Sequence, residues 1–183
     1  YFFGLHRERT AADPELERAL WASLQLQLEW LRANLEWHLL GNHLFANAKA
    51  LVFAGLFFEG PEAQAWLATG QRILERELPE QILADGAQFE RSPMYHALAL
   101  EDVLDLINII GACARAESPV RQLVAPLRLH ACRMLHWLRC MQHPNGALAR
   151  FNDCAEGIAP TTADLERYAA ALGIAAPPAS GEG

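Results

Sequence analysis

The sequence predicts an all-α protein of antiparallel helical hairpins. Apolar residues recur at steps of three and four, which is the spacing of one face of a helix. The first such stripe comprises Leu16, Leu20, Leu24, Leu28, Leu31 and Leu35. Between the turn signals, no run of alternating apolar and polar residues indicates a β-strand.

The first predicted helix begins at Asp13-Pro14, because Asp is a favoured N-cap residue and Pro suits the first helical position. It should end at Gly41, a typical stop signal. A second helix is predicted from Asn42 to Phe58. It is apolar on nearly all sides, which indicates burial.

The later helices are bounded by similar signals, and we expect them at about 61–83, 93–114, 119–142 and 163–172. Ser92-Pro93 and Ser118-Pro119 are the predicted caps of the middle pair, and Thr161 or Thr162 caps the last helix. Pro79 and Pro126 are expected to kink their helices.

Composition excludes several function classes. With 183 residues and 52% hydrophobic side chains, the chain can form a core, and its net charge of −7 argues against general nucleic-acid binding. Lys49 is the only lysine. The longest apolar run, residues 50–58, is too short to cross a bilayer, and the four cysteines show no disulfide framework.

Short connections between long helices imply antiparallel neighbours. The second and fourth helices then run in the same direction, so their N-termini share one rim of the bundle, and the fifth helix ends there. Three polar segments, Asn42-His43, 90–96 and 143–153, should therefore meet at this rim.

Asn42 and His43 are candidates at the first of these segments. Asn42 fits an N-cap role and a site role about equally. His43, in the first turn of this helix, is a candidate proton acceptor. Asn47, about one turn later, should line the same cleft.

The second segment offers Tyr95, which is either a rim aromatic with a solvated hydroxyl or a proton-transfer residue supported by a nearby positive charge. Arg91, His96 and Glu90 adjoin it as substrate-binding candidates, and a surface ion pair between Glu90 and Arg91 would explain those two residues almost as well. The third segment adds Arg150 and Asn152 as substrate-binding candidates.

A rival site lies on the fifth helix, where one face carries Cys132, His136, Cys140 and His143. A zinc site needs ligands that converge tetrahedrally, and one helix cannot wrap four of them around an ion. We therefore expect buried cysteines and hydrogen-bonded histidines here, and assign no metal.

Three stretches together resemble the heparinase II/III-like polysaccharide lyases: "LEWHLLGNHLFANAKALVFAGLFFEG", "ERELPEQILADGAQFERSPMYHALALEDVLDL" and "HPNGALARFNDCAEGIAP". The resemblance covers residues 24–173. It implies an incomplete (α/α) toroid followed by a β-sandwich. Residues 1–175 would then be a piece of the toroid catalytic domain, and residues 176–183 a linker toward a β-sandwich region that this sequence does not contain.

The resemblance also implies a function, β-elimination on a uronic-acid-containing polysaccharide. Asn42 matches the family residue that neutralises the uronate carboxylate, and Tyr95 matches the catalytic tyrosine, a general acid and in some stereochemistries also the base. His43 matches a position that serves as base in related lyases. The partner would be an acidic polysaccharide, resembling heparan sulfate, alginate or a bacterial exopolysaccharide.

No cofactor is expected within this chain, because any metal site of the family lies in the β region. Family resemblance favours the bacterial cell envelope, periplasm or secretion, although localisation stays unassigned. Alone, the chain should be nearly inactive. Three alternatives remain: a non-catalytic glycan-binding module, a scaffold whose rim contacts a protein partner, and an (α/α) glycoside hydrolase using Glu90 and Asp153.

Overall fold

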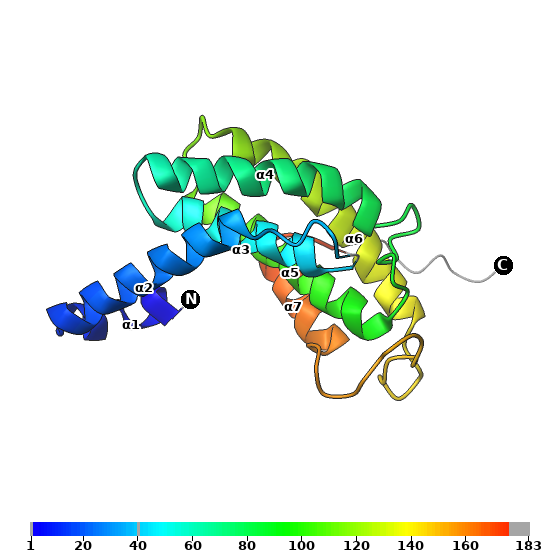
Figure 1. Ribbon diagram of the computed structural model, residues 1–183. Coiled ribbons are helices and arrows are strands. Elements are labelled where there is room, and N and C mark those ends of the chain that lie inside the picture. The colour runs from blue at the N-terminus through cyan, green and yellow to red at the C-terminus, as the bar shows by residue number, and fades with distance from the viewer. Residues whose placement is uncertain (1, 40, 176–183) are drawn as a thin grey trace. The chain divides into compact units, whose positions relative to one another are not determined.

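A computed structural model describes residues 2–39 and 41–175, and within them it contains helices and no β-strand (Figure 1), which confirms the all-α prediction. The helices are α1 (Phe2–Ala11), α2 (Pro14–Ala33), α3 (His43–Phe57), α4 (Pro61–Gln81), α5 (Pro93–Cys113), the 3₁₀ helix η1 (Pro119–Leu123), α6 (Val124–Cys140) and α7 (Thr162–Ala171). The predicted linker, 176–183, lies outside the described residues. In the described ranges, no helix has the length and hydropathy of a membrane-spanning segment.

The chain divides into two compact units, Tyr1–Leu35 and Glu36–Gly183. In the first unit, α1 packs against α2, and the Asp13 side chain accepts hydrogen bonds from two backbone N–H groups of α2, as its predicted cap role requires. Helix α2 ends at Ala33, well before the predicted stop at Gly41. Asn34 closes it: the Asn34 side chain donates to the Trp30 carbonyl at 2.8 Å.

The second unit contains two helical hairpins, α3 with α4 and α5 with α6, and α7 packs against α5 and α6 (Figure 1). Helix α3 also packs against α5. The turn before α3 touches the turn before α5, and Lys49 further along α3 bonds to Asp102 further along α5, so these two helices run in the same direction. Closure of such hairpins into a toroid stays a prediction.

Two predicted caps differ in the structure. Ser92 and Ser118 occupy the N-cap positions of α5 and η1, but neither side chain makes a capping hydrogen bond. Thr161, in contrast, accepts a hydrogen bond from the Asp164 N–H and caps α7. Pro126 lies in the first turn of α6 and Pro79 in the last turns of α4, so both helices continue through them.

Helices α3 and α4 approach closely because two glycines lie between them. A Cβ atom on Gly55 would lie 2.5 Å from Leu67 Cβ, and one on Gly70 would lie 2.8 Å from the Ala48 carbonyl oxygen. Both distances are shorter than van der Waals contact, so α3 and α4 would have to separate to admit a methyl group.

We therefore expect Gly55→Ala to lower the free energy of unfolding by roughly 1–3 kcal/mol, the usual cost of overpacking. Gly111→Ala is the matched control: this glycine is also helical, but a Cβ there would meet nothing within 4 Å. It should raise stability by roughly 0.5–1 kcal/mol, because Ala is the better helix former. Urea unfolding of both variants measures the difference, and equal effects would contradict the close packing.

The turns that follow α4 and α6 have the same construction. After α4, the Asp85 side chain accepts from the Ala87 N–H at 3.0 Å, and Gly86 has φ +93°. After α6, the Asn145 side chain accepts from the Ala147 N–H at 3.1 Å, and Gly146 has φ +84°. Each turn also carries an isolated antiparallel bridge. The two helical hairpins thus end in equivalent turns, and each turn leads into a predicted site segment.

Candidate functional site

The segment before α3 lies directly against the segment before α5. A Cβ atom on Gly41 would lie 3.2 Å from Glu90 Oε1, and Gly41 has φ +101°, a left-handed conformation that favours glycine. The Gln81 side chain at the end of α4 donates to the Gly41 carbonyl at 3.0 Å. The backbone that carries Asn42 and His43 is therefore held at the start of α5.

Two buried glutamines, Gln81 and Gln88, organise this contact. The Gln88 amide donates to Gln81 Oε1 at 3.3 Å and to Glu90 Oε1 at 3.1 Å, and its own Oε1 accepts from the Glu90 N–H at 3.0 Å. Glu90 is thereby oriented from inside the protein. Neither glutamine was predicted from the sequence as part of the site. The only sequence feature that could have pointed to Gln88 is its position in the same turn as Glu90.

The third segment joins the other two through Asn152. Its side-chain amide donates to the carbonyl oxygens of Glu90 at 3.2 Å and Arg91 at 3.4 Å. Arg91 and Asn152 both have positive φ, 56° and 42°. Such non-glycine residues carry local strain and tend to cluster at functional sites. The three predicted segments therefore meet, and we call residues 41–43, 88–95 and 150–153 the rim.

Asn42 lies at the N-cap position of α3, yet it does not cap the helix. Its backbone is helical (φ −75°, ψ −7°), and its side chain makes no capping hydrogen bond. Asn42 and Tyr95 are both half-buried, with Tyr95 in the first turn of α5. The capping interpretation of Asn42 is therefore wrong, and its amide is not committed to the helix end.

His43 lies beside a carboxylate that the sequence analysis missed. Its Nδ1 atom is 3.4 Å from Glu36 Oε1, and the His43 side chain is 53% exposed. Asn47, which is mostly buried, donates to Glu36 Oε2 at 2.9 Å and accepts from the Glu36 N–H at 3.1 Å. Asn47 thus holds Glu36, and its predicted direct contact with substrate does not fit this geometry.

His96 is fully buried and both of its ring nitrogens are engaged. Nδ1 accepts from the Gln88 N–H at 3.1 Å, so Nε2 carries the proton and donates to the Met134 carbonyl at 3.0 Å. The ring also packs on Trp137, with centroids 4.5 Å apart. The predicted substrate contact of His96 is therefore wrong, because this side chain ties α5 to α6 instead.

Burial lowers the pKa of His96 from 6.5 to about 4. Below pH 6.5 an unfolded chain takes up a proton that the folded protein accepts only near pH 4, so stability falls as the pH drops through this window. We expect His96 to account for a loss of about 3 kcal/mol in the free energy of unfolding between pH 6.5 and 4.

Urea unfolding across this range measures the effect. His96→Gln should be less stable at pH 7 and should lack most of the pH-dependent loss, whereas exposed His143→Gln should keep it. An unchanged pH dependence in His96→Gln would contradict the buried neutral ring.

The remaining predicted side chains lie at the surface. Arg150 forms an ion pair with Glu156 in which both side chains are more than half exposed. Arg91 is exposed as well, and its carbonyl is the part that Asn152 binds. Phe151, between Arg150 and Asn152, is 56% exposed and is an aromatic rim residue that the sequence analysis missed.

The rival cysteine and histidine face does not form a cluster. His136 Nε2 lies 3.9 Å from Cys140 Sγ, as expected one turn apart on a helix. Within residues 2–39 and 41–175, no three metal-ligating side chains gather closely enough to hold an ion.

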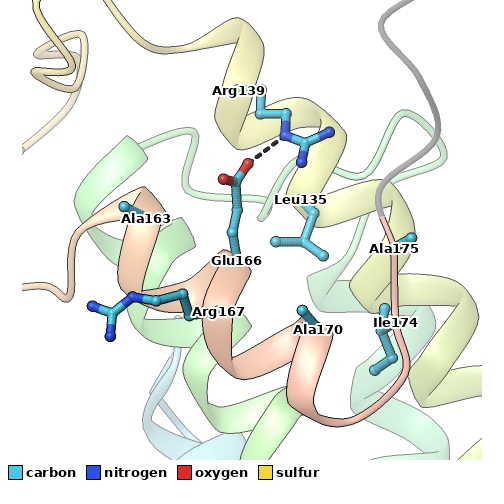
Figure 2. A pocket seen from close by; sticks show the side chains of 8 residues that line it. All are labelled: Leu135, Arg139, Ala163, Glu166, Arg167, Ala170, Ile174 and Ala175. Carbon is cyan, nitrogen blue, oxygen red and sulfur yellow. Dashed lines mark hydrogen bonds and ion pairs between the residues drawn. The ribbon is translucent and has the colours of Figure 1, made fainter.

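A pocket of about 460 Å³ lies between α6 and α7, and no residue of the rim lines it. Figure 2 shows the ion pair of Arg139 with Glu166 joining the two helices beside Leu135, with Arg167 pointing outward. The pocket is lined by Leu135, Arg139, Ala163, Glu166, Arg167, Ala170, Ile174 and Ala175. None of the predicted site residues belongs to it.

Comparison with known proteins assigns this chain to a family. The model of the heparinase II/III N-terminus matches residues 10–171, which is most of the chain. The chain belongs to the heparinase II/III family. The resemblance noted from its motifs is thereby confirmed. No solved structure matches the chain significantly.

Curated relatives of this heparinase II/III family chain are heparin-sulfate lyases of Bacteroides and Pedobacter. The lyase of Bacteroides stercoris is 43% identical over 70 residues, which are 38% of this chain and 10% of the relative. That of Pedobacter heparinus is 42% identical over 62 residues (33% and 9%), and that of Bacteroides thetaiotaomicron 34% over 89 residues (48% and 13%). The matched segments thus span about a tenth of each relative.

Proposed function

We propose that the protein containing this chain cleaves a uronic-acid-containing polysaccharide by β-elimination, and that the rim supplies part of its active site. The observation that carries the proposal is the meeting of three segments at the rim: Gly41 against Glu90, and Asn152 on the carbonyls of Glu90 and Arg91. This contact brings the backbone of Asn42 to the start of the helix that carries Tyr95, in a chain of the heparinase II/III family.

The proposed reaction needs three groups. One neutralises the uronate carboxylate, so that the proton on C5 becomes more acidic; a base removes this proton; and an acid protonates O4 as the C4–O4 bond breaks and a C4=C5 double bond forms. The Asn42 amide would stabilise the charge that develops on the carboxylate, as oxyanion-hole donors do. The Tyr95 hydroxyl would donate the proton to O4.

His43 is the proposed base for substrates in which Tyr95 does not itself remove the proton. Glu36, held by Asn47, lies beside Nδ1 of His43. A carboxylate at Nδ1 favours the tautomer in which Nε2 is free to accept a proton, and it stabilises the imidazolium that results. Glu36 is thus a positioning residue for His43.

Substrate contacts are proposed at the outer side of the rim. Arg91 offers an exposed guanidinium that can bind a carboxylate or sulfate in bidentate geometry. Exposed Phe151 offers an apolar face for a sugar ring. We propose that three other residues shape the rim: Glu90 and Asn152 through hydrogen bonds within it, and Arg150 through its surface ion pair with Glu156.

The relatives' names point to a heparan-type substrate, while the single lysine fits a less densely charged polyuronate. The complete protein should be incubated with heparan sulfate, an alginate-like polyuronate and a neutral glucan, and the ultraviolet absorbance of the unsaturated product followed. Absorbance should rise with at least one acidic polymer and never with the glucan. No rise with any uronate polymer would overturn the proposal.

A further inference from the structure

A polar cluster lies between α3, α5 and α7. Lys49 Nζ donates to Asp102 Oδ1 and to Asp105 Oδ2, at 2.6 Å each, and the Tyr168 hydroxyl donates to Asp105 Oδ1 at 2.8 Å. The Lys49, Asp102 and Asp105 side chains are 21%, 24% and 10% exposed. We call these four residues the Lys49 cluster. No role for Lys49 was predicted from the sequence.

The position of this cluster along the two helices is informative. Lys49 is seven residues after Asn42, and Asp102 is seven residues after Tyr95. Seven residues are two turns of an α-helix, or about 10 Å. Because α3 and α5 run in the same direction, the Lys49–Asp102 bond joins them at the same depth below Asn42 and below Tyr95.

The cluster differs in kind from the surrounding contacts. Helix α3 meets its neighbours through buried residues such as Leu51 and Val52, and apolar contact is not directional. Charge-assisted hydrogen bonds are short and directional. Burial opposes the charge on Lys49, but the carboxylates of Asp102 and Asp105 outweigh it and raise the pKa of Lys49, so the ammonium stays charged.

We propose that Lys49, bound by Asp102 and Asp105, is a positioning residue that fixes the register of α3 against α5 and so sets the separation of Asn42 and Tyr95. This inference rests on the proposed function, because its consequence is catalytic. A displacement of about 1 Å between reacting groups can lower turnover about 10²-fold.

The test uses the complete protein and its best acidic polysaccharide. Lys49→Met keeps the length of the side chain and removes its charge. We expect kcat to fall by roughly 10²-fold with KM changed by less than about threefold, because register affects the transition state more than ground-state binding. Lys49→Arg should recover most of the loss. If kcat is unchanged in folded Lys49→Met, or Lys49→Arg recovers nothing, the proposal is wrong.

Arg139→Met is the matched control, because it removes another ion pair between helices, that of Arg139 with Glu166, which includes no residue of the rim and none of the Lys49 cluster. Its kcat should stay within about twofold of wild type. If Arg139→Met lowers kcat as much as Lys49→Met, general destabilisation explains both. Should Lys49→Met fail to fold, the near-isosteric Asp102→Asn should lower kcat by roughly tenfold, and full activity in that variant would overturn the proposal.

Making the same substitution in a Tyr95→Phe protein distinguishes an effect on the register of α3 and α5 from an effect on stability. In a Tyr95→Phe protein, Lys49→Met should lower the residual kcat by less than about twofold, since the hydroxyl that it misaligns is absent. A further loss near 10²-fold would indicate a structural role alone and would contradict the proposal.

A third measurement separates this inference from the proposed function. If the wild-type protein yields no unsaturated product, the proposed function fails and amide hydrogen exchange decides the inference. The first-turn bonds Ala46 N–H to Asn42 O and His96 N–H to Ser92 O report on the two helix starts. Exchange there should accelerate roughly tenfold in Lys49→Met and stay unchanged in Arg139→Met. Unaltered exchange in Lys49→Met would overturn the inference.

Discussion

Replacing Tyr95 by Phe should lower turnover of a uronate polysaccharide by on the order of 10³-fold, while substrate affinity changes by no more than a few fold. The substitution removes one hydroxyl and leaves the half-buried ring in the first turn of α5. Removing a general acid typically costs 10²–10⁴-fold in rate. The ring can keep its packing, so the free energy of unfolding should change little.

Turnover is followed by the absorbance of the unsaturated product, affinity by calorimetry with an oligouronate, and stability by urea unfolding. Tyr95→Phe should lower turnover and leave affinity and stability nearly unchanged, because only turnover depends on the hydroxyl. Retained turnover in Tyr95→Phe would remove this residue from the reaction.

Replacing Asn42 by Ala should lower kcat by on the order of 10²–10³-fold, the usual effect of losing one donor to a developing oxyanion. The structure makes this prediction sharper than the sequence could. Loss of a capping Asn usually costs about 1 kcal/mol, but the Asn42 side chain makes no capping hydrogen bond. Stability should therefore change by less than about 0.5 kcal/mol.

Thr161→Ala provides the matched control for Asn42→Ala. Thr161 does cap its helix, through the Asp164 N–H, and lies outside the rim. Its loss should cost about 1 kcal/mol of stability without changing kcat. If Asn42→Ala instead resembles Thr161→Ala in both measurements, Asn42 is a structural residue.

Much of the second unit could be predicted from short signals in the sequence. Thr161, for example, marks a real helix start, because it acts through a local hydrogen bond to the Asp164 N–H. The rim also followed from sequence, since short connections fix helix directions and directions fix which ends meet. This is why segments around Asn42 and Asn152, distant in the chain, were expected together.

Predictions of side-chain direction were weaker, and Tyr95 and His96 show why. Successive residues on a helix point about 100° apart, so neighbours in sequence face different surroundings. His96 therefore enters the contact with α6 while Tyr95 stays half-buried at the rim. The packing partner, the Met134 carbonyl, lies on another helix and leaves no trace in the local sequence.

The end of α2 and the partner of His43 were missed for related reasons. The leucine stripe continues to Leu35, but Asn34 closes the helix with its own hydrogen bonds, and local capping outweighs apolar periodicity. The contact of Glu36 with His43 could not be predicted, because it forms only when the turn after α2 lies beside α3. The Lys49 cluster likewise depends on three helices meeting, which no single segment encodes.

If the rim belongs to a lyase, the mass of the products formed in water enriched in heavy oxygen should reveal it. Elimination breaks the C4–O4 bond without adding water. The new non-reducing ends should therefore be unsaturated and lighter than those from hydrolysis by one water, and the new reducing ends should carry no heavy oxygen. Saturated non-reducing ends, together with heavy oxygen on C1 of the new reducing ends, would instead identify a hydrolase and show that the rim does not serve an elimination.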